Sequence, residues 1–319
     1  MTDALPPGVV PFDVAESQKL AAHNFITVVF GGYKTGKTHF WNQSVRPLYV
    51  VYLDTNPNLD SHLLKSRGFG DEVYILRIPP IPYKDLTEEI AKSYLDKIEK
   101  FAEWAKENAR KNVAEGKPGG TFVVDGATYL KGYLEKFYLT ESPTLGYRPA
   151  AGSRAAYSTY DFVKPNSAIF EFVSGFTQQS LDAIFVFEGR QIWRNELDSK
   201  GVAKSVKTDA WKSTRPDRLP FAVNAEIETM KVVERANPSD NKSPLISRMK
   251  MRVVYNSENP AFDHMVFDAL GHQQFKEMML SEAVGTEALK DAKHISEVTR
   301  ANSSGLMETE DEEVADVAE

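Results

Sequence analysis

Residues 25–30 read Phe-Ile-Thr-Val-Val-Phe, and positions 31–38 continue with Gly-Gly-Tyr-Lys-Thr-Gly-Lys-Thr. The first six residues are apolar or β-branched, which is typical of a buried strand. The next eight fit the pattern G-x-x-x-x-G-K-[ST], in which glycines let the backbone turn tightly and point its N–H groups at a phosphate. A helix is expected to follow at residues 39–44. A strand before the pattern and a helix after it favour a phosphate-binding loop, or P-loop, over a chance match in a surface loop.

The last two residues of the P-loop carry most of its expected chemistry. Lys37 supplies a mobile positive charge for the β- and γ-phosphates of a nucleotide. Thr38 offers a hydroxyl to Mg²⁺ and opens the following helix, whose N-terminus favours an anion. The candidate phosphate-binding residues are Gly31, Gly32, Tyr33, Lys34, Thr35, Gly36, Lys37 and Thr38.

Composition excludes several other classes of site and protein. The chain has 319 residues and no cysteine, which rules out a disulfide framework, a thiolate metal site and a thiol nucleophile. Residues 1–10 lack a basic segment before an apolar one, so we expect no secretory signal. No apolar run approaches the length that spans a bilayer. We therefore expect a cytoplasmic protein with no membrane partner.

The net charge of −7 is concentrated at the C-terminal end of the chain. Residues 307–319 contain seven acidic residues and no Lys or Arg. Removing these seven from the 45 acidic residues leaves 38, which equals the 38 basic ones. Such a tail buries too little apolar surface to offset the entropy of ordering, so we expect it to be disordered. We also expect it to compete with nucleic acid for basic loops; a solubility segment, or a docking peptide for a partner such as a single-strand-binding protein, stays open as an alternative.

Apolar strand segments alternate with helical patterns along the rest of the chain. The alternation predicts an α/β fold whose mostly parallel sheet has helices on both faces. Late strands at residues 225–234 and 246–255 are expected to add antiparallel pairing near the C-terminal end. The further expected strands cover residues 48–53, 73–78, 121–124 and 183–187.

The expected helices and domain boundaries follow from the same patterns. Asp85 with Glu88 has the spacing of a capping box, so we expect Asp85 to cap the long helix that follows. Residues 189–224 show neither the apolar period of a helix nor that of a strand, so they are expected to be irregular. Four parts are predicted: an N-terminal arm at residues 1–24, the α/β domain at 25–270, a helical region at 271–306 and the acidic tail at 307–319.

Asp125 is the leading candidate for a metal-binding carboxylate. It ends the apolar run Phe122-Val123-Val124, where a P-loop ATPase holds Mg²⁺, usually through water. The alternative is an aspartate that caps a strand-to-helix turn. The next residue is Gly126, whereas many helicases, AAA+ machines and packaging motors place a water-activating glutamate there, which counts against those classes.

Taken together, these motifs resemble the RecA-like ATPases, specifically the small RecA-core ATPases of bacteriophages that act in recombination and single-strand annealing. The resemblance covers residues 25–255 and depends on residues 31–38, 54–60 and 122–125, of which only the first motif is specific by itself. It implies a RecA-like P-loop NTPase core that hydrolyses ATP with Mg²⁺. It further implies single-stranded DNA as a partner, a homo-oligomer, and the host cytoplasm as the location.

One departure from the family concerns the residue that activates water. RecA-like enzymes carry a glutamate two residues after the aspartate that matches Asp54, and this chain has Asn56. An amide orients water but does not take its proton. Asp54, Asp60 or Glu188 takes over that role, or hydrolysis is slow. The resemblance implies that Glu188, at the end of the fifth strand, senses the γ-phosphate; an ordinary strand-end carboxylate is the alternative.

A basic segment at residues 189–218 is the candidate nucleic-acid contact. It holds eight cations against four acids, together with two tryptophans. Cations hold phosphates and indoles stack on bases, a combination that suits single-stranded nucleic acid. The alternative is a solvated hairpin with one tryptophan packed on the core. The candidate contacts are Arg190, Trp193, Arg194, Lys204, Lys207, Trp211 and Lys212.

A second basic group lies in the last long strand. Arg248, Lys250 and Arg252 alternate with apolar residues, which places all three cations on one face. RecA-like oligomers use cations in this region to reach the nucleotide of a neighbouring subunit. The alternative is a polar face exposed to solvent.

Three functions compete. The first is a RecA-like ATPase that acts on single-stranded DNA in phage recombination or replication. The second is a nucleotide-binding regulatory or assembly protein with little hydrolysis. The third is a P-loop phosphotransferase, in which residues 189–218 would form a lid over a second substrate. A partitioning ATPase with a deviant P-loop is disfavoured, because Phe30 precedes the motif where that class has lysine.

Overall fold

The computed structural model describes residues 24–53, 72–82, 84–141, 162–197, 203–236, 242–258, 260–268 and 270–280. Only the backbone is described at residues 140–141, 193–197 and 203–210. The expected arm up to residue 23, the segment 54–60 with its candidate water-activating Asp54, the helical region beyond residue 280 and the acidic tail lie outside the described residues.

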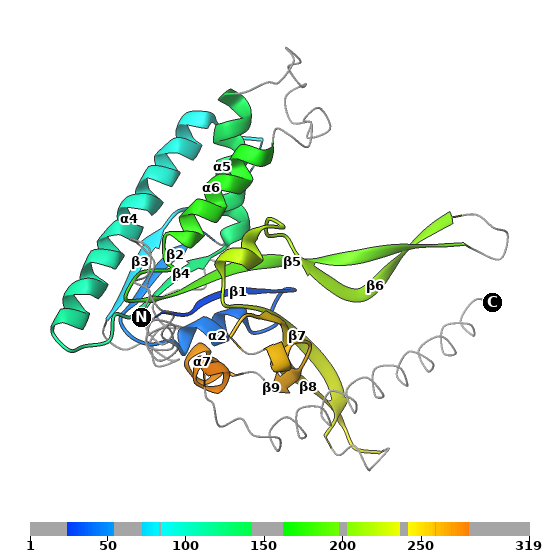
Figure 1. Cartoon of the computed structure of the whole chain (residues 1–319). Helices are drawn as coiled ribbons and strands as arrows, with labels where there is room; N and C mark the ends of the chain where they lie inside the picture. Colours follow the sequence, from blue (N-terminus) through cyan, green and yellow to red (C-terminus); the bar gives the residue numbers. More distant parts are fainter. Residues whose placement is uncertain are drawn as a thin grey trace, which may run out of the picture.

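The described part of the chain contains a nine-stranded sheet flanked by helices (Figure 1). Its strand order is β3-β2-β4-β5-β1-β7-β8-β9, and β6 pairs with β5 off this path. The strands are β1 Ile26–Gly31, β2 Leu48–Tyr52, β3 Val73–Arg77, β4 Thr121–Asp125, β5 Asp182–Leu197, β6 Ala203–Ser213, β7 Ala225–Arg235, β8 Leu245–Asn256 and β9 Val266–Asp268.

The pairing directions confirm the predicted fold class at a coarse level. The strands from β3 to β7 pair in parallel, whereas β7–β8, β8–β9 and β5–β6 pair antiparallel. The antiparallel additions are therefore concentrated in the later part of the chain, as the patterns predicted. All six residues of β1 are buried, which explains why this strand is continuously apolar.

Helices cover both faces of the sheet. On one face, α4 Glu88–Ala114, α5 Ala127–Glu141 and α6 Val163–Ser174 pack on a core that includes Val28 and Phe30 of β1. On the other face, α2 Lys37–Asn42 and α7 His272–Leu280 pack on a core that includes Val29. Alternate residues of β1 thus enter opposite cores, as the period of a strand requires. Two short 3₁₀ helices, η3 Leu219–Ala222 and η4 Pro260–Phe262, connect later strands.

Two local predictions are wrong. The long helix α4 begins after Thr87, whose hydroxyl accepts a hydrogen bond from the backbone N–H of Ile90 at 3.3 Å, so Thr87 rather than Asp85 is the cap. Residues 189–224 are not irregular throughout: β5 runs on to Leu197 and pairs with β6 in an antiparallel hairpin, which matches the alternative given for the basic segment. This β5–β6 hairpin projects away from the sheet (Figure 1), where neither of its faces needs the apolar alternation that marks a core strand.

Among the described helices, none combines the length and the apolar character needed to cross a bilayer.

Candidate functional site

The P-loop lies where the sequence predicted it, between β1 and α2. β1 ends at Gly31 and α2 begins at Lys37. Gly36 has a φ of 102°, a backbone conformation that a residue with a Cβ rarely adopts. A Cβ on Gly36 would also lie 2.9 Å from Sδ of Met249 on β8. The backbone conformation of the turn therefore favours glycine here, and a side chain at this position would also have to displace the end of Met249.

Lys37 folds back over the loop that precedes it. Its Nζ donates hydrogen bonds to the carbonyls of Gly31 at 3.0 Å and Gly32 at 2.6 Å. These bonds hold the ammonium group over the loop at the end of β1. A phosphate bound by the loop would meet this charge without a large movement of the lysine.

A pocket of about 290 Å³ lies beside the P-loop, where β1 and β4 end and where β5 passes from the parallel sheet into the hairpin. It contains the predicted Lys37, Asp125 and Glu188, which come from α2, β4 and β5 respectively. Ligands of open parallel sheets bind outside the carboxyl ends of the strands, and this pocket lies at that edge. Its lining residues are Gly31, Gly32, Tyr33, Lys37, Asp125, Gly126, Tyr129, Val186, Phe187, Glu188, Gly189 and Trp211.

The Asp125 carboxylate is held by a tryptophan that follows the P-loop. Asp125 is only 6% exposed, and its Oδ2 accepts a hydrogen bond from Nε1 of Trp41 at 3.0 Å. Trp41 is fully buried on α2. The next residue, Gly126, has a φ of 99° and turns the chain from β4 into α5. The carboxylate is therefore presented in one orientation at the end of its strand.

Oxygen groups at the site suit a hard cation such as Mg²⁺. Asp125 offers a carboxylate, and Thr38 stands half-buried at the start of α2 with its hydroxyl. Among the described residues, no group of three or more His, Cys, Asp and Glu side chains is placed to hold a metal ion. Mg²⁺ here would therefore take its other ligands from phosphate oxygens and water, as it does in many nucleotide sites.

Glu188 is fixed through its backbone while its side chain is exposed. Its N–H donates to Oγ1 of Thr128 at 2.8 Å, and its carbonyl accepts from the backbone N–H of Thr214 at 3.2 Å and from its Oγ1 at 3.1 Å. Thr128 lies on α5, three residues after Asp125. These bonds fix the strand ends that carry Glu188 and Asp125 relative to each other.

Thr229 supports the P-loop from β7, a contact that the sequence analysis missed. Its Oγ1 lies 2.8 Å from Oγ1 of Thr35, and Thr35 also donates to the carbonyl of Gly32 at 2.9 Å. A Cβ on Gly31 would lie 2.2 Å from the Thr229 carbonyl oxygen. The two threonines are 194 residues apart, and nothing in the local pattern marks the pair.

The β5–β6 hairpin carries the predicted nucleic-acid contacts on one ribbon. Arg190 is exposed and stands opposite Lys212, while Trp193 stands opposite Lys207. Arg194 and Lys204 are also on its two strands, and for them and for Trp193 and Lys207 only the backbone is described. Trp211 differs from this group, because its ring packs against the P-loop and lines the pocket. Contact with nucleic acid stays a prediction for all of these residues.

The three cations of β8 are paired within the chain. Arg248 and Lys250 contact Glu234 at 2.9 and 3.1 Å, and Arg252 contacts Glu228. They share one face of β8, as their alternation predicted, but that face meets acidic residues of β7. Burial raises the pKa of Glu228, and the charge of Arg252 opposes that rise. To reach the nucleotide of a neighbouring subunit, each cation would have to leave its acid.

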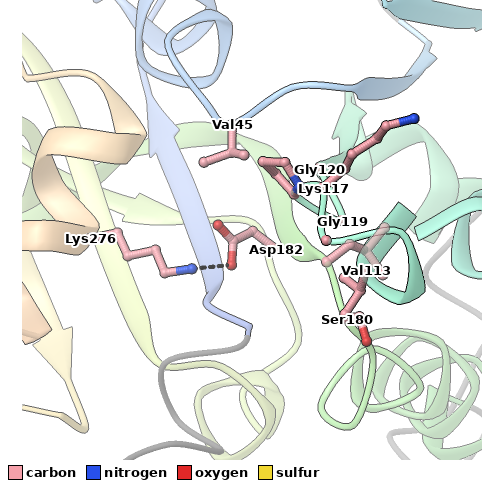
Figure 2. Close-up of a pocket in the computed structure, with 11 residues that line it drawn as sticks. Val45, Val113, Lys117, Gly119, Gly120, Ser180, Asp182 and Lys276 are labelled. Carbon is pink, nitrogen blue, oxygen red and sulfur yellow. Dashed lines mark hydrogen bonds and ion pairs between the residues drawn. The ribbon is translucent and has the colours of Figure 1, made fainter. Parts of the chain in front are cut away.

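A second pocket, of about 370 Å³, lies at the opposite end of the sheet (Figure 2). Its wall includes Asp182 at the start of β5, whose Oδ1 accepts from Nζ of Lys276 and from the backbone N–H of Phe25, both at 2.7 Å. Burial raises the pKa of Asp182, while Lys276 lowers it. The pair joins α7 to the first residues of β1 and β5.

No protein-family model matches this chain, and no curated protein does. Its function is therefore inferred from the geometry of the residues described above.

Proposed function

We propose that this chain is a Mg²⁺-dependent ATPase with a RecA-like P-loop core. The observation that carries the proposal is the pocket at the carboxyl ends of the parallel strands, which brings Lys37, Asp125 and Glu188 together. A lysine on a P-loop, a strand-end aspartate and a second carboxylate are the groups that phosphoryl transfer to water requires.

Each group has a distinct part in this proposal. The N–H groups of the P-loop and the ammonium of Lys37 bind the phosphates and stabilise the charge that develops on them. Thr38 and Asp125 hold Mg²⁺, which neutralises phosphate charge when it is bound. Glu188, exposed at the pocket, orients a water molecule and accepts its proton. The Trp41 indole donates a hydrogen bond to the Asp125 carboxylate and so holds it in the orientation proposed for binding the metal.

Single-stranded nucleic acid is the proposed partner of the β5–β6 hairpin. The hairpin begins immediately after Glu188, so the strand that reaches the pocket continues as the basic ribbon. Residues 189–218 carry eight cations against four acids. Cations that contact the phosphate backbone of a nucleic acid bind single strands with little sequence preference, and this binding weakens as the salt concentration rises.

The proposal is tested by measuring phosphate release from ATP with Mg²⁺, with and without a poly-dT oligonucleotide. We expect turnover that the oligonucleotide stimulates at low salt. Asp125→Asn should lose Mg²⁺-dependent turnover and keep its melting temperature. Asp96→Asn on α4, an exposed aspartate away from the pocket, is the matched control. Full activity of Asp125→Asn would show that the metal-binding carboxylate is another residue.

A nucleotide-binding regulatory protein with slow hydrolysis is the second candidate. The observation that favours it is that Glu188 is the only carboxylate besides Asp125 among the described residues that line the pocket, and it is exposed. Tight ATP binding with no turnover in either condition would select this candidate. Turnover that requires a small acceptor would select a phosphotransferase.

A further inference from the structure

Trp211 is the one large aromatic side chain that the β5–β6 hairpin contributes to the pocket residues described above. The residue lies on β6 opposite Gln191 and is half-buried. A Cβ on Gly32 would lie only 3.3 Å from Cη2 of the indole, so the ring rests against the P-loop backbone. It also packs against the apolar core under α4, α5 and α6.

The position of this ring relates it to one particular phosphate. Lys37 of a P-loop reaches the β- and γ-phosphates, and the pocket extends from Lys37 toward Glu188. The space between them is therefore the place for the terminal phosphate and the attacking water. An indole on this wall excludes bulk water on one side, which strengthens the electrostatic contacts inside.

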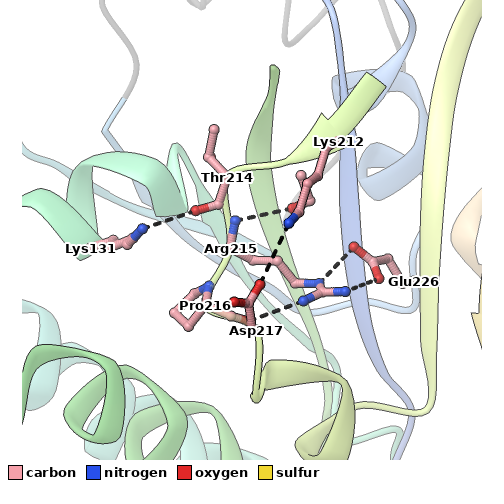
Figure 3. A network of polar contacts seen from close by, with 8 residues as sticks. Lys131, Lys212, Thr214, Arg215, Pro216, Asp217 and Glu226 are labelled. Atoms are coloured by element: carbon pink, nitrogen blue, oxygen red, sulfur yellow. Dashed lines mark hydrogen bonds and ion pairs between the residues drawn. The ribbon is translucent and has the colours of Figure 1, made fainter. Parts of the chain in front are cut away.

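The base of the hairpin is held to the rest of the domain (Figure 3). Arg215 makes two hydrogen bonds to the buried carboxylate of Glu226 on β7, at 2.7 and 2.6 Å. Thr214 bonds to Thr128 at 3.0 Å, and its carbonyl accepts from Lys131 at 3.2 Å. The ribbon thus has a fixed base directly after Ser213, and Trp211 lies on the hairpin side of that base.

The other strand of the hairpin also crosses the P-loop closely. A Cβ on Gly189 would lie 2.9 Å from the carbonyl carbon of Gly31. The hairpin is therefore in contact with the P-loop on both of its strands, through Gly189 on β5 and Trp211 on β6. A change in the angle of the ribbon would move the indole relative to Gly32.

We propose that Trp211 is a positioning residue that closes the terminal-phosphate end of the pocket and couples it to the β5–β6 hairpin. This rests on the proposed nucleotide site. A ligand that binds the hairpin and favours the indole position against Gly32 raises the affinity of the pocket for a triphosphate. Linkage then requires the triphosphate to raise the affinity of the hairpin for that ligand by the same factor.

The test compares two nucleotides in the full chain, a slowly hydrolysed ATP analogue and ADP, each with Mg²⁺. Trp211→Ala should weaken binding of the triphosphate about tenfold and change ADP affinity by less than about twofold, because only the triphosphate reaches the indole. Trp211→Phe should retain most of the triphosphate affinity. Trp104→Ala is the matched control and should alter neither affinity; Trp104 lies on α4, where it stacks on Phe101 and meets Tyr74 edge to face.

Tryptophan fluorescence supplies a second measurement. The wild-type chain should change its emission when the triphosphate analogue binds, and Trp211→Phe should lose most of that change while it still binds. If the wild-type chain binds neither nucleotide, the proposed function and this inference both fail. If it binds both, and Trp211→Ala matches the wild type in its preference for triphosphate over ADP, the inference fails and the proposed function stands.

Discussion

The two ends of the sheet each hold a pocket whose lining includes a lysine and an aspartate, and these side chains have different partners at the two ends. At the amino ends of the strands, Lys276 and Asp182 bond directly to each other at 2.7 Å. At the carboxyl ends, Lys37 donates to loop carbonyls and Asp125 accepts from the indole of Trp41. The two pockets are similar in size, at about 370 and about 290 Å³.

Pocket size therefore does not separate the two ends of the sheet, and the partners of the charged side chains do. A buried lysine and aspartate that bond to each other neutralise their charges and act as a structural link. At the carboxyl end, the loop carbonyls and the Trp41 indole orient Lys37 and Asp125 beside the P-loop, in the pocket that both residues line. We therefore propose that the chemistry belongs to the carboxyl end, where the P-loop lies, and that the pair at the amino end has a structural role.

Removing Lys37 is the largest test of this assignment. Lys37→Ala should lower ATP turnover by about 1,000-fold, equivalent to about 4 kcal/mol, because a charge that stabilises the transition state is lost. Its melting temperature should stay close to that of the wild type. Phosphate release and thermal unfolding measure the two effects, and Lys92→Ala on the exposed face of α4 is the control. Wild-type turnover in a folded Lys37→Ala chain would remove the P-loop from the proposal.

Removing Lys276 should have the opposite pattern. Lys276→Met leaves Asp182 buried without its cation and should lower the free energy of unfolding by about 3 kcal/mol. The affinity of the folded chain for ATP should not change. The double variant Lys276→Met/Asp182→Asn should recover much of the loss, since the amide oxygen still accepts the N–H of Phe25. Chemical denaturation measures stability, and a selective loss of ATP binding would show that the amino-end pair belongs to the site.

The buried His272 should make the free energy of unfolding depend on pH. It is fully buried between the rings of Phe25 and Phe40, and burial lowers its pKa from the ordinary 6.5 to about 3, with a smaller contribution from Lys276. The unfolded chain therefore binds a proton below the ordinary pKa that the folded chain does not take up. The resulting stability is complete above pH 6.5 and is lost as pH falls toward 3.

The expected loss from His272 is about 2 kcal/mol between about pH 7 and about pH 5. His272→Phe should remove this part of the pH dependence, because phenylalanine does not titrate. His39→Phe, at an exposed histidine, should keep it. Urea unfolding at several pH values measures the difference between the variants, and parallel pH profiles for wild type and His272→Phe would contradict the assignment.

What was predictable from sequence differs between the parts of the site for physical reasons. The P-loop pattern and Asp125 depend on local features, a glycine-rich turn after an apolar strand and a carboxylate at a strand end. Their places in the fold could therefore be predicted, and their roles stay predictions. The strands of the β5–β6 hairpin were not predicted because they lie largely outside the core and need no apolar period, although a hairpin with one tryptophan packed on the core was the alternative for this segment. The cap of α4 was misplaced by two residues, since Thr87 and Asp85 both have the chemistry of a cap.

Contacts between distant segments were beyond any local pattern. The bond between Trp41 and Asp125 joins residues 84 apart, and the Thr35–Thr229 contact depends on β7 lying beside β1. The ion pairs of β8, in contrast, could have been predicted from the sequence. Glu228 and Glu234 are an even number of residues apart, so they lie on the same face of β7. This strand was expected to pair with the strand that carries the three cations, and opposite charges on facing strands favour pairing.

Trp41 provides the smallest and most specific test of the carboxyl-end arrangement. Trp41→Phe keeps an aromatic ring in the core but removes the N–H that Asp125 accepts. Groups that orient a metal ligand typically change metal affinity by tenfold or more, so the Mg²⁺ concentration for half-maximal turnover should rise about tenfold. Binding of ATP without Mg²⁺ should not change, because the N–H that the variant removes donates to the Asp125 carboxylate. Trp104→Phe is the control for loss of an indole elsewhere, and its Mg²⁺ dependence should match the wild type. If Trp41→Phe lowers stability but leaves the Mg²⁺ dependence unchanged, the indole serves only the core, and the orientation of Asp125 must come from other contacts at the end of β4.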